Sequence, residues 1–70
     1  MLKNLLTKIE ECNTSEDMML LDEEIVTGLK TIMADRSLSK EEKIDQANEL
    51  YSATIIKGFE IFKEILKEEV

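Results

Sequence analysis

Histidine, tryptophan and proline are absent from this 70-residue sequence, and Cys12 is its single cysteine. Without a second cysteine the chain cannot form an internal disulfide, and without histidine it lacks the commonest transition-metal ligand. A chain this short buries only about 60% of the surface that its unfolded state exposes, so its core is marginal. Stability must then come from dense helix packing or from association with another chain.

Basic residues are also scarce, with nine Lys and Arg against sixteen Asp and Glu, for a net charge of −7. An acidic chain repels phosphate backbones, so we expect no direct nucleic-acid binding, while the same charge can steer the chain toward a partner with a basic surface. No run reaches the roughly 18 apolar residues of a membrane span, and residues 1–11 do not read as a signal peptide. We expect a cytoplasmic protein of a bacterium or a phage, with no membrane association.

Apolar residues recur at three- and four-residue intervals and predict helices over 2–12, 16–34 and 40–69. Ser39 and Glu42 form a capping box that marks the start of the third helix. These patterns predict one all-α domain over residues 1–70. In the third helix the main apolar face comprises Ile44, Ala47, Tyr51, Ile55, Phe59, Phe62, Ile65 and Leu66, with Leu50 and Ile61 on its flank.

The lengths of the three helices allow two architectures. Either the first helix folds back as the third member of a small helical bundle, or the first two lie end to end and the resulting helical hairpin pairs with a second copy. Gly58, where the third helix can bend or cross a neighbour closely, decides between them. We expect a homodimer, because the apolar end of the third helix needs the first helix or a second subunit to cover it. The predicted oligomer interface consists of Phe59, Phe62, Ile65 and Leu66.

Acidic residues cluster in the first half of the second helix, where no Lys or Arg falls between Ile9 and Leu29. The cluster can be a solvated face that complements the helix dipole, or a docking patch for a basic surface. Leu20 and Ile56 lie off the main apolar arcs of their helices and are candidate apolar contacts for a partner. The candidate acidic contacts are Glu16, Asp17, Glu23 and Glu24.

Asp22 interrupts the apolar face of the second helix. A carboxylate among apolar side chains needs a hydrogen-bonding partner, so we expect a buried polar residue that sets the register of the helices. Cys12 closes the apolar stripe of the first helix, with no neighbouring cation to activate its thiol. We expect it to face the core.

No motif for catalysis, a metal or a cofactor is found. Calcium-binding loops, nucleotide-binding loops and paired carboxylates on facing helices are all missing, so we expect no enzyme. The hypothesis that best fits is a small acidic helical module for protein–protein interaction, acting as an inhibitor or regulator of one protein partner. The alternatives are an assembly subunit whose oligomer is itself the function, and a phage- or plasmid-encoded nucleic-acid mimic that blocks a basic host protein.

Overall fold

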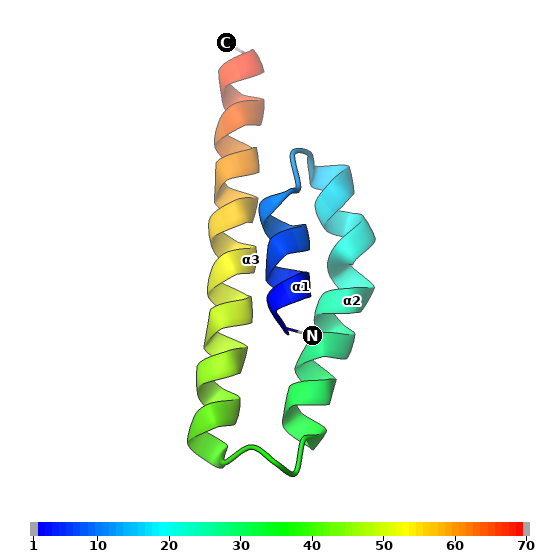
Figure 1. The fold of residues 1–70 in the computed structure, drawn as a ribbon. Helices are drawn as coiled ribbons and strands as arrows, with labels where there is room; N and C mark the ends of the chain where they lie inside the picture. The colour runs from blue at the N-terminus through cyan, green and yellow to red at the C-terminus, as the bar shows by residue number, and fades with distance from the viewer. Residues whose placement is uncertain (1, 70) are drawn as a thin grey trace.

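The computed structural model describes residues 2–69 and contains three helices, which confirms the all-α prediction. They are α1 (Leu2–Glu10), α2 (Ser15–Ala34) and α3 (Lys40–Glu69). Figure 1 shows that α1 and α3 run in the same direction and that α2 runs opposite to both. The chain therefore forms an up–down–up bundle, the first of the two architectures expected. The bounds of α3 are those predicted, whereas α1 ends two residues earlier, at Glu10.

Side-chain caps fix where the two longer helices begin. Thr14 Oγ1 accepts the backbone N–H of Asp17 at 3.1 Å, and Asp17 Oδ2 accepts the backbone N–H of Thr14 at 3.3 Å. The Ser39–Glu42 capping box forms as predicted, with distances of 3.1 Å and 3.0 Å for the two reciprocal bonds. Each box supplies hydrogen-bond acceptors for backbone N–H groups at the start of the helix, which have no acceptor within the helix itself.

Two lysines of α3 donate hydrogen bonds to the carboxyl-terminal ends of α1 and α2. Lys57 Nζ donates to the backbone oxygen of Glu10 at the end of α1, at 2.8 Å. Lys43 Nζ donates to the backbone oxygen of Met33 near the end of α2, also at 2.8 Å. The last carbonyls of a helix carry partial negative charge, so a cation there stabilises the helix end and also ties it to α3.

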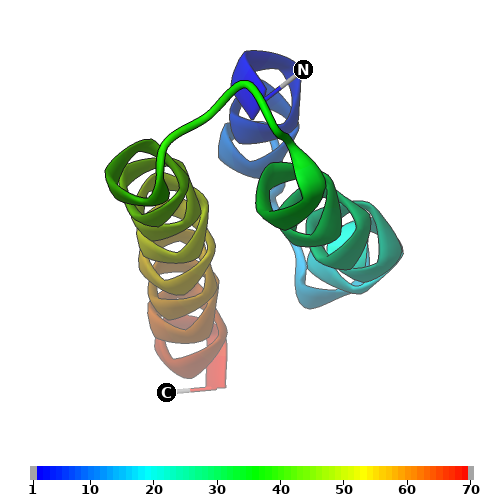
Figure 2. The same ribbon diagram turned by 90° about the horizontal axis from the view of Figure 1, so that it is seen from below.

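The core lies where all three helices meet, and Ile9 and Leu50 are its most fully buried large side chains. Cys12 is also buried, as predicted, just beyond the end of α1. Figure 2 shows that α1 lies on one side of the α2–α3 pair and that no helix covers the other side. The buried apolar residues are Leu5, Ile9, Cys12, Ile25, Ile32, Leu50 and Ile61.

The side of α3 that is buried is not the one expected. Leu50 and Ile61, expected at the flank of the apolar arc, are buried, whereas most of the predicted main face is exposed. Of the two alternatives expected for covering the end of α3, α1 does not do so, because Phe59, Phe62, Ile65 and Leu66 are exposed. The nine residues of α1 lie on the opposite side of the α2–α3 pair, and the carboxyl-terminal part of α3 extends beyond the other two helices (Figure 1).

Two further expectations are corrected. Asp22 is exposed rather than buried, because it lies on the side of α2 that α1 leaves open. Gly58 neither bends α3 nor allows a close helix crossing. α3 continues through it without interruption, and a β-carbon built at Gly58 would meet no atom within 4 Å.

Candidate functional site

An exposed leucine on α2 lies among the acidic residues that the sequence singles out. Leu20 is 79% exposed. Residues three and four positions away in a helix are its surface neighbours. For Leu20 all four of these positions carry carboxylates, so the structure brings the predicted apolar contact and the acidic cluster together. These neighbours are Glu16, Asp17, Glu23 and Glu24.

Two of the four carboxylates also have local structural roles. The backbone N–H groups of Asn13 and Thr14 donate to the Asp17 carboxylate. These hydrogen bonds hold the pKa of Asp17 below its ordinary value. Glu24 Oε1 lies 3.1 Å from Lys8 Nζ and links α2 to α1. Within the described part of the chain, Glu16 and Glu23 make no side-chain hydrogen bond or ion pair. They are therefore the carboxylates freest to meet a basic partner.

A shallow depression of about 320 Å³ adjoins Leu20, between the end of α1 and the start of α2. Cys12 lines it, but the thiol is directed inward and donates to the backbone oxygen of Lys8 at 3.3 Å. Burial, and then the nearby Asp17 carboxylate, raises the pKa of the Cys12 thiol. A raised pKa favours the protonated thiol at neutral pH, which makes Cys12 a weaker nucleophile than an exposed thiol.

Ile56, the second predicted apolar contact, is exposed but belongs to α3. Leu20 is on α2 and Ile56 is on α3, so the two predicted apolar contacts belong to different helices. The structure therefore groups Leu20, and not Ile56, with the acidic cluster.

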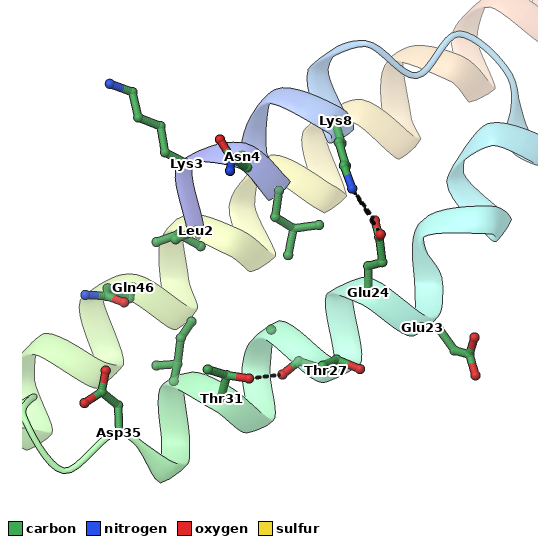
Figure 3. Close-up of a pocket in the computed structure, with 13 residues that line it drawn as sticks. Leu2, Lys3, Asn4, Lys8, Glu23, Glu24, Thr27, Thr31, Asp35 and Gln46 are labelled. Atoms are coloured by element: carbon green, nitrogen blue, oxygen red, sulfur yellow. Dashed lines mark hydrogen bonds and ion pairs between the residues drawn. The ribbon is translucent and has the colours of Figure 1, made fainter.

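A larger groove of about 930 Å³ runs between α1 and α2 (Figure 3). The Lys8–Glu24 ion pair bridges it, and Thr31 Oγ1 donates to the backbone oxygen of Thr27 at 2.9 Å along one wall. Of its charged side chains, Lys3 and Glu23 point away from the other labelled residues in Figure 3. The carboxylates of Glu23, Glu24 and Asp35, which line the groove, point in different directions in Figure 3.

The most extensive apolar surface lies on the side of the α2–α3 pair opposite α1. It arises because four buried residues, Ile25, Ile32, Leu50 and Ile61, are each followed directly by an exposed apolar one. Each step turns about 100° around the helix. Because α2 and α3 run in opposite directions, this turn carries the exposed apolar residues of both helices to the same side of the α2–α3 pair. We call this surface the open apolar face; it consists of Met19, Val26 and Met33 from α2, and of Ile44, Tyr51, Ile55, Phe59, Phe62, Ile65 and Leu66 from α3.

The sequence pattern assigned four of these ten residues to an oligomer interface and placed Ile44, Tyr51 and Ile55 with them on the main apolar face of the third helix. The signal that was missed is the seven-residue spacing of Met19, Val26 and Met33, which keeps them in one row along α2. Asp22 stands between Met19 and Val26 and is also exposed, so a carboxylate interrupts the α2 row. The row on α3 has no such interruption.

Among residues 2–69, no group of three or more Asp, Glu or Cys side chains is arranged to hold a metal ion. None of the helices described in this range has the length and apolarity to cross a membrane. The sequence matches no protein-family model, and no curated protein or solved structure shows significant similarity to it.

Proposed function

We propose that the protein is a non-enzymatic cytoplasmic binding module that docks on one protein partner as an inhibitor or regulator. Its contact surface would be Leu20 with the carboxylates around it. The observation that carries the proposal is the position of a 79% exposed leucine with an acidic residue at each of its four neighbouring helical positions. An apolar side chain within a ring of one charge suits a partner that offers an apolar pocket with a basic rim.

The two kinds of side chain would contribute differently to binding. Glu16 and Glu23, which have no ion pair within the described chain, would attract the basic rim and accelerate association. Leu20 would enter the pocket and supply much of the affinity, since burying a leucine side chain is worth about 1.5–3 kcal/mol. Asp17 and Glu24 would contribute less, because the helix cap and Lys8 already engage them.

A pull-down from an extract of the encoding organism tests the proposal. Glu16→Lys with Glu23→Lys should abolish capture of the partner, and Leu20→Ala should weaken it by about tenfold or more. The matched control is Asp45→Lys with Glu49→Lys, which makes the same change in charge at two exposed positions of α3. Capture that both double variants reduce equally, or that neither reduces, contradicts the proposed contact surface.

An assembly role is the second candidate, in which the homodimer is itself the function. The open apolar face favours it, because soluble monomers rarely leave so large an apolar surface in contact with water. This role would use a different side of the bundle from Leu20. The two candidates can therefore hold together, with one face for a second copy and one for another protein.

A further inference from the structure

The row of apolar residues along α3 has symmetric spacing. Starting at Ile44, the intervals to Tyr51, Ile55, Phe59 and Leu66 are seven, four, four and seven residues. Reversing the direction of the helix about Ile55 therefore returns these five positions, whereas Phe62 and Ile65 of the face fall opposite Asn48 and Asp45. A two-fold interface requires a surface that is complementary to itself in this way, because the same patch faces itself across the axis.

Ile55 also lies at the middle of α3, which extends from Lys40 to Glu69. We infer that a second copy of this chain covers the open apolar face, with the two α3 helices packed antiparallel about a two-fold axis at Ile55. Ile44 of one copy then faces Leu66 of the other, and Tyr51 faces Phe59. Residues 41–69 of each α3, 29 of its 30 residues, overlap in this arrangement.

The area available agrees with a stable dimer. The seven α3 side chains of the face are between 40% and 68% exposed. Together they present on the order of 800 Å², which is about what each partner buries in an interface of standard size. The largest apolar patch of a typical monomer is only about 300–600 Å². The face is therefore large enough for a specific interface without any help from α2.

Charge does not oppose burial of this row. Between Ile44 and Leu66 the charged residues of α3 all project to other sides of the helix, and Lys63 at the edge lies with its ammonium group 5.1 Å from the Phe59 ring centre. Its aliphatic stem can therefore border the interface while its charge stays in water. These off-face residues are Asp45, Glu49, Lys57, Glu60, Lys63 and Glu64.

The shape of the bundle favours the same arrangement. α2 has 20 residues and α3 has 30, so one end of the molecule contains α2 beside α3 and the other contains α3 alone (Figure 1). An antiparallel pair places the thick end of one copy beside the thin end of the other. The α2 row, with Met33 at its lower end, then extends the apolar contact where the second copy has only α3.

This inference does not depend on the proposed docking surface around Leu20, which lies on the outer flank of α2.

The first test is the molar mass in solution, measured by light scattering behind a sizing column over a tenfold range of concentration. We expect twice the 8.1 kDa of one chain. Ile55→Lys should give 8.1 kDa with unchanged helical circular dichroism, since Ile55 is exposed within its own chain. Ile56→Lys, on the adjacent but outward-facing residue, should remain dimeric.

Disulfide trapping tests the direction of the helices. Ile55→Cys should form a disulfide between two copies on mild oxidation, whereas Ile56→Cys should not. A mixture of Ile44→Cys and Leu66→Cys proteins should give the mixed disulfide, identified by mass spectrometry, while buried Cys12 stays reduced.

A wild type of 8.1 kDa throughout, or an Ile55→Lys variant that still dimerises, overturns the inference. An Ile44→Cys protein that forms a disulfide with itself more readily than with Leu66→Cys overturns the antiparallel arrangement. None of these outcomes bears on the pull-down with the Leu20 variants.

Discussion

The side chain of Leu5 on α1 occupies the space that a β-carbon on Gly28 of α2 would need. Leu5 Cδ2 lies 2.9 Å from the ideal position of that carbon, inside any ordinary contact distance. The absence of a side chain at Gly28 thus lets α1 approach α2 closely enough for Leu5 to enter the core. The same glycine lowers the intrinsic stability of α2, because glycine costs about 1 kcal/mol against alanine in a helix interior.

This contact leads to a prediction for Gly28→Ala. In the wild-type background the new methyl group must displace the end of Leu5, so the gain in unfolding free energy should fall well below about 1 kcal/mol. In a Leu5→Val background the clash is removed and most of that gain should appear. Gly58→Ala serves as the control, because its β-carbon meets no atom within 4 Å and should give the full gain. Urea unfolding measures the change in unfolding free energy that Gly28→Ala causes. An equal increase in both backgrounds would show that the contact with Leu5 does not reduce the gain.

The burial of Ile9 can be tested against an exposed residue of the same type. Ile9→Val removes one methylene from the most crowded part of the core and should lower the unfolding free energy by about 0.5–1.5 kcal/mol. Ile56→Val makes the same chemical change on the exposed flank of α3 and should stay within about 0.5 kcal/mol of the wild type. Urea denaturation of the two variants checks the difference, and a reversed order would contradict the assignment of the core.

Lys57 should matter more for stability than an ordinary surface lysine. Its ammonium group donates to the backbone oxygen of Glu10, which joins positions 47 residues apart and closes the end of α1. Lys57→Met keeps most of the stem but loses this bond, and should lower the unfolding free energy by about 0.5–1.5 kcal/mol. Lys67→Met, which loses only an exposed ion pair with Glu64 at 3.5 Å, should cost less than about 0.5 kcal/mol. Thermal unfolding of both variants at one pH makes the comparison, and equal losses would contradict it.

The helix cap at Asp17 gives a prediction for pH dependence. Hydrogen bonds hold the folded-state pKa of this carboxyl below its unfolded value, so the folded state binds its proton less readily. The stabilisation is therefore complete above the unfolded pKa of about 3.9 and is lost as the pH falls through the lower folded value. Asp17→Asn keeps a side-chain acceptor but removes the charge. We expect wild type to have the higher melting temperature at pH 7, and the difference to shrink by pH 2.5. A difference that is independent of pH would contradict a role for the charge.

Helix positions and caps could be predicted because they depend on residues close together in the chain. The box of Ser39 and Glu42 forms across three residues, and Thr14 with Asp17 repeats the pattern at α2. The grouping of Leu20 with the carboxylates around it likewise follows from spacings of three and four within one helix. Such features need no knowledge of how the helices pack.

The choice of buried face could not be read in the same way. The apolar arc of α3 spans about half its circumference, so the periodicity of the sequence is equally consistent with burial of Leu50 and with burial of Tyr51. Leu50 is buried and Tyr51 is exposed because α1 lies against one side of the α2–α3 pair, a position that contacts such as Leu5 with Gly28 determine. Asp22 was misplaced for the same reason, since its side of α2 received no covering helix.

By itself the sequence therefore determined the helices, their caps and the acidic surroundings of Leu20, all of which arise from interactions over a few residues. Only the tertiary structure decided which part of each apolar arc is buried and which remains as the open apolar face. The physical reason is that α1 is only nine residues long and can cover only one side of the α2–α3 pair. Packing across that side determines what the other side presents to water.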